Sequence, residues 1–344
     1  MNVSTAQSID VLLGPSEGRF FGEGFRAVEH DIRHVTLGPL HNGVFGASGS
    51  ASLTYPSGWS TKRVASDLIP HLSTIDAFVL ATALVDVLLI KLFGLLPHQR
   101  ATAWIRAVEF RAGPSPVESL ADVAMTAWVT SIAKAPNAID GPYQSTVEAA
   151  VGGIKMRFVV CHEMATYVVR EEDLADGSGV LGAPEERFYG VGYKRHLHAI
   201  DQLRFSDDGS SLTARVEVTA ADGTAYGADL GGAYRPSVSI LDCIVAQSQI
   251  TQALLYRLDD IDRGDTNTLW MRKVRIETRT PHRPLDAAFD ARTRVDASRV
   301  MSIRGGAYRS TEFSGCFQGL LSKYSLAHEL PASARAAVPA VVVL

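Results

Sequence analysis

The chain has 344 residues, of which 46% are hydrophobic and 20% charged, and its formal net charge is −4. This length suits two domain-sized units, and the balanced charge gives no general reason to expect nucleic acid or an anionic membrane as a partner. The three cysteines, Cys161, Cys243 and Cys316, are far apart and odd in number, which argues against a disulfide scaffold. They fit a reducing compartment, and no basic segment followed by an apolar run begins the chain, so we expect a cytoplasmic protein.

The first half is predicted to contain strands, then one long helix, then more strands. Small and β-prone residues in 25–54 indicate strands with bends, and Pro70 precedes the helical stretch. Further strand patterns follow at 102–110, 123–132 and 147–161. The last pattern contains Gly152 and Gly153, which predict a bulge or bend.

The helical stretch 75–96 is almost uniformly apolar and about long enough to cross a bilayer. However, Asp76, Asp86 and Lys91 interrupt it, and no flanking Lys/Arg bias or aromatic belt marks it as a span. A helix that is apolar on nearly all sides is also typical of burial within protein. We therefore interpret this segment as a buried helix.

The second half is predicted to follow the same order as the first. The acidic, Gly-rich stretch 171–186 before it indicates a linker. Strand, helix and strand patterns then follow at 212–219, 239–258, 270–276, 287–295 and 300–313. The predicted organisation is a first unit at 1–170, the linker at 171–186, a second unit at 187–330 and an Ala/Pro-rich tail at 331–344.

An internal repeat supports two units. Residues 13–30 match residues 181–198 at eight of eighteen positions without a gap, far above chance. Further matches lie 166 positions apart: Pro70 with Pro236, Ser73 with Ser239, Asp76 with Asp242, Trp104 with Trp270, and Arg106 with Arg272. The chain is therefore predicted to be two copies of one unit.

The long helix of each unit suggests the fold. Such a helix needs burial on more than one side, and a curved antiparallel sheet wrapped around it provides that burial. This is the hot-dog arrangement. The expected fold class is α+β, a double hot-dog of two tandem units with sheets joined edge to edge; a pair of unrelated α+β domains is the alternative.

Four matched residues are candidates for catalytic proton transfer. Asp76 and Asp242 stand near the helix starts, where Asp is favoured as a cap and where burial would raise a carboxyl pKa towards neutrality. His30 and His198 match across the repeat, and the ordinary pKa of histidine suits proton transfer near pH 7. Structural roles stay open for all four, because an internal match shows common descent of the halves rather than catalysis.

The Gly-rich blocks each contain an arginine. Arg19 and Arg187 either pair with Glu17 and Glu185 to stiffen a turn, or contact a carbonyl, carboxylate or phosphate of a substrate. Together with Tyr193 of the second block, we expect them to contribute to substrate binding.

The two halves differ along the central helix. The second helix has polar residues where the first is largely apolar: Gln247, Ser248, Gln249, Thr251 and Gln252. Polar side chains on a central helix predict a pocket, and their presence in one half predicts one working site.

We expect that site to use Asp242, Gln247 and a histidine of the first half, either His30 or His41. His71, just before the first helix, is a further candidate. No metal site is expected, because no third ligand stands at metal spacing from His162 and Glu163.

The repeated block resembles a known family. The pattern Leu-Gly-x-x-Glu-x-Arg-Phe-[Phe/Tyr]-Gly-x-Gly-[Phe/Tyr], at 13–25 and 181–193, is similar to that of the avirulence D (AvrD) family. The resemblance implies syringolide synthesis, in which a β-ketoacyl chain delivered as a thioester joins a ketopentose such as xylulose, followed by ring closure. It implies an acyl carrier protein or CoA as the thioester partner, and it allows a homodimer.

The helix-start Asp followed by Gln is also similar to hot-dog dehydratases and to the A-factor synthase type. In those dehydratases Gln lies one helical turn after the Asp, whereas Asp242 has Ala246 there and Gln247 one residue later. This departure puts simple dehydration in doubt. The first hypothesis is an acyltransferase/cyclase that needs no metal or redox cofactor; a dehydratase or thioesterase, and a non-catalytic lipid-binding protein, are the alternatives.

Overall fold

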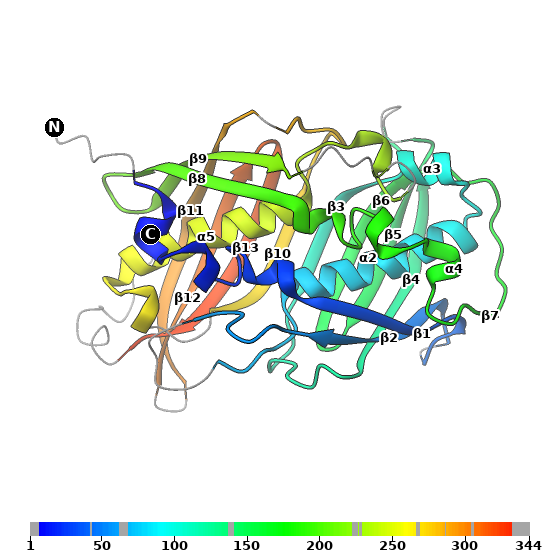
Figure 1. Cartoon of the computed structure of the whole chain (residues 1–344), viewed down its shortest axis with the longest axis horizontal. Helices are drawn as coiled ribbons and strands as arrows, with labels where there is room; N and C mark the ends of the chain where they lie inside the picture. The colour runs from blue at the N-terminus through cyan, green and yellow to red at the C-terminus, as the bar shows by residue number, and fades with distance from the viewer. Residues whose placement is uncertain are drawn as a thin grey trace.

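Two long helices, α2 (Thr74–Lys91) and α5 (Ile240–Asp259), lie against one continuous antiparallel sheet in the computed structural model of the chain. Figure 1 shows the helices roughly end to end, with most strands behind them and β1, β2, β8 and β9 in front. The structure describes residues 7–41, 43–61, 68–136, 141–221, 226, 229–265, 269–285, 287–303 and 306–331.

The sheet has thirteen strands among these residues. The strands of the first half are β1 (Glu29–Pro39), β2 (Phe45–Thr54), β3 (Trp104–Arg111), β4 (Val123–Lys134), β5 (Tyr143–Val151), β6 (Ile154–His162) and the short β7 (Glu172–Asp173). Those of the second half are β8 (His196–Phe205), β9 (Ser211–Ala220), β10 (Trp270–Glu277), β11 (Phe289–Ile303), β12 (Gly306–Phe317) and β13 (Leu320–Glu329).

Apart from the extra β7 at one end, the strand order reads the same from both ends towards the middle. It runs β7-β1-β2-β4-β5-β6-β3 and then β10-β13-β12-β11-β9-β8. The central strands β3 and β10, which carry the matched Trp104 and Trp270, pair with each other in antiparallel register. The sheets of the two halves are thus joined edge to edge, and the element order of the repeat is confirmed.

Helix α2 begins with a capping box in which Ser73 and Asp76 exchange hydrogen bonds. Every side chain from Ile75 to Leu89 is buried, and α2 packs on β2, β4, β5 and β6. The interpretation of this stretch as a buried helix is confirmed, although it ends at Lys91, before the short α3 (Pro97–Thr102). No helix of the described residues is long and apolar enough to cross a membrane.

The two repeated blocks are short helical turns that cross between the halves. The first contains η1 (Ser16–Gly18) and η2 (Gly24–Ala27) and follows the short helix α1 (Ile9–Leu13). The second contains η4 (Pro184–Glu186) and η5 (Gly192–Arg195) and follows the short helix α4 (Ser178–Leu181). α1 packs on α5 of the second half, whereas α4 packs on α2 of the first half. Gln249 of α5 donates to the Phe21 carbonyl at 2.8 Å, and Tyr189 contacts Phe78 of α2 edge-on at 5.5 Å. Each block therefore completes the packing around the other half's helix.

Several expectations about local structure need correction. The single strand expected at 147–161 is two strands, β5 and β6, and the bulge or bend expected at Gly152 and Gly153 is the turn between them, because Val151 pairs with Ile154 across it. Strands β8 and β13 had no prediction of their own. The stretch predicted as a linker contains β7, which pairs with β1, and α4. Residues 332–344 of the predicted tail lie outside the described residues.

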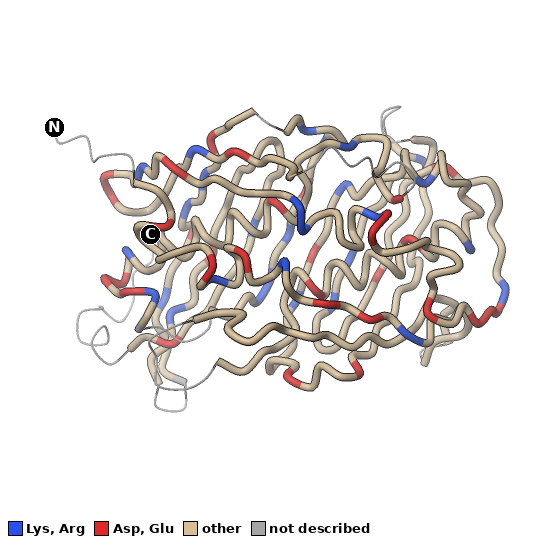
Figure 2. Tube along the Cα trace, viewed as in Figure 1, with Lys and Arg blue, Asp and Glu red and all other residues tan. Residues whose placement is uncertain are grey.

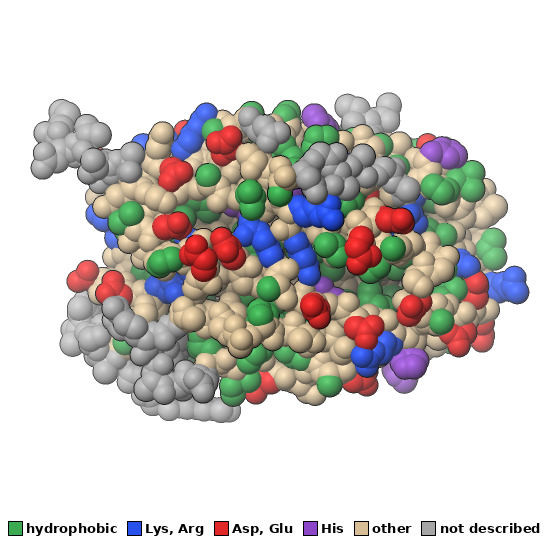
Figure 3. Space-filling view, viewed as in Figure 1, with side chains coloured by type: hydrophobic (Ala, Val, Ile, Leu, Met, Phe, Trp, Pro, Cys, Tyr) green, Lys and Arg blue, Asp and Glu red, His purple; other side chains and the backbone are tan. Residues whose placement is uncertain are grey.

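Charged residues of both signs are distributed along both halves of the chain (Figure 2). On the face seen in Figure 3, acidic and basic side chains are interspersed with apolar ones. This distribution agrees with the small net charge of the sequence.

Candidate functional site

Asp76 lies at the third position of α2, where its carboxylate is completely buried. The Oδ2 atom accepts hydrogen bonds from the Ser73 amide (3.2 Å), the Ser73 hydroxyl (2.6 Å) and the Tyr55 hydroxyl. The Oδ1 atom lies 2.8 Å from His30 Nε2. Burial raises the pKa of Asp76, but the hydrogen bond and charge of His30, with the bonds from Ser73 and Tyr55, outweigh burial and lower the pKa overall.

Because an ionised carboxylate only accepts hydrogen bonds, His30 donates from Nε2 to Asp76.

Asp242 occupies the matching position on α5 but has two histidine partners. His196 Nδ1 lies 3.0 Å from both carboxylate oxygens, and His198 Nε2 lies 2.8 Å from Oδ1. Ser239 completes the capping box through its amide (2.6 Å) and hydroxyl (2.7 Å). Burial raises the pKa of Asp242, but the two histidines outweigh it and hold that pKa well below its usual range.

The pairing expected between Asp242 and a first-half histidine is therefore wrong. His30 bonds Asp76 of its own half, and His41 is exposed just after β1. The repeat also concealed His196, since its counterpart in the first half is the buried Val28.

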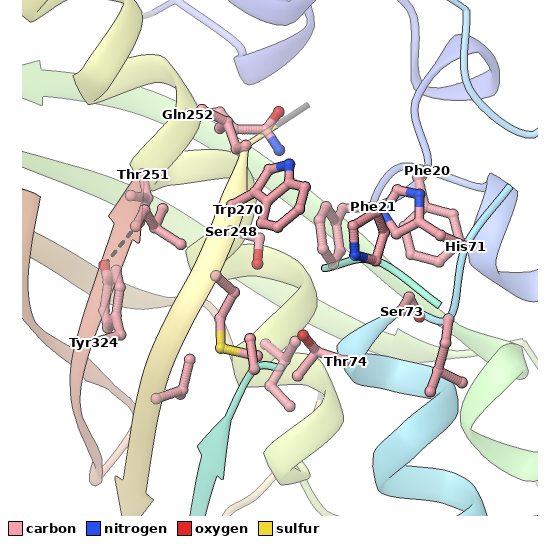
Figure 4. Close-up of a pocket in the computed structure, with 18 of the residues that line it drawn as sticks. Phe20, Phe21, His71, Ser73, Thr74, Ser248, Thr251, Gln252, Trp270 and Tyr324 are labelled. Carbon is pink, nitrogen blue, oxygen red and sulfur yellow. Dashed lines mark hydrogen bonds between the residues drawn. The ribbon is translucent and has the colours of Figure 1, made fainter. Parts of the chain in front are cut away.

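A cavity of about 230 Å³ lies between the start of α2 and the face of α5. Figure 4 shows Ser73 and Thr74 at the helix start, with Phe20, Phe21 and His71 beside them and Trp270 across the space. Ser248, Thr251 and Gln252 come from α5, and Tyr324 comes from β13. The first block, both helices and the central strand β10 thus build one cavity.

The polar side chains on the α5 wall are held by specific hydrogen bonds. Gln247 Nε2 donates to the carbonyls of Arg292 (3.3 Å) and Cys316 (3.2 Å), and its Oε1 accepts from Thr293. The Thr251 and Tyr324 hydroxyls are 2.7 Å apart (Figure 4). Gln247 lines the cavity as predicted, but its amide is used within the protein.

The equivalent space in the other half is nearly closed, with a volume of about 30 Å³. Several of its lining residues match, in the repeat, residues that line the large cavity. Ser237 matches His71, Ile240 matches Thr74, Tyr189 matches Phe21, and Trp104 matches Trp270. Here the buried Arg283 stands where the large cavity has Val117, and Arg235 lies 3.4 Å above the Phe188 ring. These larger side chains fill the space.

Of the remaining residues predicted to bind substrate, one lines the cavity and two are packed elsewhere in the protein. Arg19 lines the cavity. Arg187 is buried near Asp86, away from the lining of either space, and is not in the place expected for substrate binding. Tyr193 stacks on Phe25 at 6.3 Å between the two blocks and is likewise not at the cavity.

Sequence reasoning missed Tyr55 and named His71 only as a further candidate. Tyr55 has no counterpart in the repeat pattern that would have drawn attention to it. His71 lines the cavity, and its Nδ1 lies 3.1 Å from the Ile69 carbonyl. A carbonyl only accepts, so Nδ1 is the protonated nitrogen and Nε2 has the lone pair.

No group of three metal-ligating side chains occurs within the part of the chain that the structure describes. His162 instead contacts Ser145 at 2.8 Å and the Glu163 carbonyl at 2.5 Å. Glu163 accepts from Gln99 at 2.7 Å. His162 and Glu163 are therefore part of the packing against α3.

The fold and site define an α+β protein of two like halves that share one open, mostly apolar cavity at a helix start. The family model described as Pseudomonas avirulence D protein (AvrD) matches residues 4–331, nearly the whole chain. The chain therefore belongs to the AvrD family.

Solved structures with some likeness include a conserved protein of unknown function with hot dog fold from Alicyclobacillus acidocaldarius. It is 10% identical, with 90% of this chain and 98% of that chain covered and a TM-score of 0.33. A MaoC-like dehydratase is 9% identical (74% and 83% covered, TM-score 0.36). The 12:0-ACP thioesterase from Umbellularia californica is 10% identical (67% and 78% covered, TM-score 0.31). Because these TM-scores are low, the similarities support no conclusion about substrate or reaction. No curated protein matches the chain.

Proposed function

We propose that this protein is an acyl-lipid biosynthetic enzyme that joins a β-ketoacyl thioester to a ketopentose-like acceptor and promotes cyclisation, as in syringolide-type synthesis. Membership of the AvrD family supports this proposal. The observation that carries it is the cavity at the start of α2, which combines an apolar lining with a polar wall on α5. A double hot-dog architecture, with the acyl thioester delivered by an acyl carrier protein or CoA in the cytoplasm, belongs to the same proposal.

The start of α2 is suited to binding a thioester carbonyl. Ser73 and Thr74 line the cavity, and the first amides of an α-helix have no partner within the helix. These amides and the helix dipole stabilise the negative charge that develops on the carbonyl oxygen during acyl transfer. Trp270, Met271 and Leu326 provide apolar surface for the acyl chain.

His71 is the base that faces this space. Its Nε2 lone pair takes the proton of the acceptor hydroxyl as that oxygen bonds to the thioester carbon. When the carbon–sulfur bond breaks, the imidazolium returns the proton to the leaving thiolate. Ring closure needs a second proton transfer from the acidic carbon between two carbonyls. Ser73, which lines the cavity and bonds Asp76 at 2.6 Å, connects the space to the Asp76–His30 pair for that step.

Incubation with a β-ketoacyl thioester, with and without xylulose, tests the function by mass spectrometry. An acylated sugar supports the proposal. We expect His71→Gln to lower its rate of formation by about a hundredfold, within the usual range for a general base. His98→Gln, which changes an exposed histidine of α3, is the matched control and should leave the rate unchanged. Equal rates for the His71 variant and the wild type would contradict the assignment of the base.

One observation favours a second candidate, a non-catalytic protein that binds a small lipid. Neither Asp nor Glu occurs among the described residues that line the cavity. Unchanged thioester with saturable binding would support this candidate. An enoyl thioester or a free acid would instead indicate the dehydratase or thioesterase alternative.

A further inference from the structure

The cavity contains a buried arginine whose hydrogen-bonding capacity is only partly used. Arg19 is 3% exposed and lines the cavity. Its Nη2 atom donates to Asp10, whose side chain is half exposed. The Nε and Nη1 atoms are buried and have no hydrogen-bond partner among the residues that the structure describes. Buried guanidinium donors without partners are costly, so an acceptor group on a substrate is their natural partner.

The same arginine in the second block has buried carboxylates beside it. Burial lowers the pKa of Arg187, and the charges of Asp86 and Asp229 oppose that effect. Both carboxylates are almost fully buried, and Asp86 Oδ1 lies 3.6 Å from Arg100 Nε. Burial raises the pKa of both carboxyls, that of Asp86 to about 7, and the Arg187 Nε atom is itself buried without a hydrogen-bond partner among the described residues. Of the two block arginines, Arg19 is the one that borders the open cavity.

The open half lacks the counterpart of Asp86. Asp86 lies on α2, and the residue 166 positions later on α5 is the neutral Gln252, which lines the cavity (Figure 4). Arg263, a second arginine, also lines the cavity and lies close enough to Arg19 for their charges to interact unfavourably. The opposing charges near Arg19 are those of Asp10 on α1 and of Glu17 and Glu23 on its own block. None of the α5 residues that line the cavity is acidic.

We propose that Arg19 binds a phosphate group on the acceptor through its buried Nε and Nη1 donors. The substrate class is then a ketopentose phosphate rather than the free sugar, and this assignment rests on the proposed function. A phosphate suits two neighbouring guanidinium groups better than a carboxylate does, because it carries more charge and a third oxygen. Arg263 contributes charge rather than new donors, since its Nη1 and Nη2 already donate to the carbonyls of Thr61 and Gly18.

Calorimetric titration with xylulose 5-phosphate, xylulose and inorganic phosphate tests the proposal. We expect xylulose 5-phosphate to bind about tenfold or more tightly than xylulose, the usual size of a charged hydrogen-bond contribution. Arg19→Gln should abolish this preference. Gln252→Asp, which places a carboxylate on α5 at the position of Asp86, should abolish it as well and does not depend on the folding of the Arg19 variant.

Arg215→Gln, which removes an exposed arginine of β9 outside the cavity, is the matched control and should keep the preference. Equal affinity of the wild type for the two sugars would overturn the proposal. A preference that survives in both Arg19→Gln and Gln252→Asp would overturn it too.

A second arm separates the acceptor from the thioester carrier as the source of the phosphate. The β-ketoacyl thioester of N-acetylcysteamine has no phosphate, whereas that of CoA does. If Arg19→Gln weakens binding of the CoA thioester alone, the phosphate belongs to the carrier and the acceptor assignment fails. Acylation of free xylulose and its phosphate at equal rates would defeat this inference but leave the proposed function intact. Binding of xylulose 5-phosphate that depends on Arg19 but gives no acylated product would support this inference and contradict the proposed function.

Discussion

Two buried aspartates anchor the starts of the long helices, and their surroundings decide what they can do. Asp76 and Asp242 are both ionised and fully hydrogen-bonded, which makes each a strong structural cap and a weak base. They differ in what lies nearby. Only the α2 start opens into a sizeable cavity, through Ser73, whereas the α5 start faces the space that Arg283 fills.

Asp242→Asn is expected to lower the free energy of unfolding by about 3 kcal/mol at pH 7, because an amide cannot accept from both histidines and Ser239. The folded-state pKa of Asp242 is lowered, so its stabilisation is complete above the unfolded value of about 3.9 and is lost as pH falls through the folded pKa. Urea unfolding at pH 7 and at pH 3 should therefore show a smaller difference from wild type at pH 3.

Asp290→Asn removes a half-exposed carboxylate of β11 and serves as the control, with little expected effect at either pH. An Asp242→Asn difference that is equally large at both pH values would contradict the ionic origin of the stabilisation.

The repeated blocks are the elements that shape the cavity. In both copies the chain turns so tightly that a glycine is required: a Cβ at Gly22 would lie 2.2 Å from the Ser16 carbonyl oxygen, and one at Gly190 would lie 2.2 Å from that of Pro184. The identical distances indicate that the two turns have the same structure.

Gly22→Ala and Gly190→Ala should each lower the free energy of unfolding by about 2 kcal/mol or more, since the contact is with backbone that cannot easily move. Thermal unfolding followed by circular dichroism measures this change. Gly179→Ala in α4 meets no atom within 4 Å and should leave stability unchanged or raise it by up to about 1 kcal/mol. Wild-type stability in the Gly22 variant would mean that the block is not held as described.

At the scale of the whole molecule, two features join the halves. Strands β3 and β10 make the sheet continuous, and each block packs on the helix of the opposite half. Neither half has its complete set of core contacts without the other.

We therefore expect a single cooperative unfolding transition for the whole chain. Scanning calorimetry should give equal calorimetric and van't Hoff enthalpies, as expected for a two-state transition. Two separable transitions would show that the halves are stable on their own. Gly22→Ala should then shift the one transition as a whole, although its site lies in the first block only.

The sequence predicted the repeated units, the long helices and the central tryptophan strands because each rests on a matched pattern. The sequence could not predict which side chains contact one another. Nothing in the spacing shows that His30 meets Asp76 rather than Asp242, because the pairing depends on which strand borders which helix start. His196 and Tyr55 were missed because neither has a match in the other half, and the run through Gly152 did not separate a bulge from a hairpin turn.

The crossed blocks have a consequence for how such a chain can change. Two separate copies of one unit, related by a two-fold axis, would exchange their blocks in the same way and would have two identical cavities. In that state any substitution alters both cavities at once. Covalent fusion of the copies removes this coupling, so Arg283 can fill one space while Val117 at the matching position leaves the other open. Tandem duplication thereby allows specialisation that a symmetric dimer cannot reach.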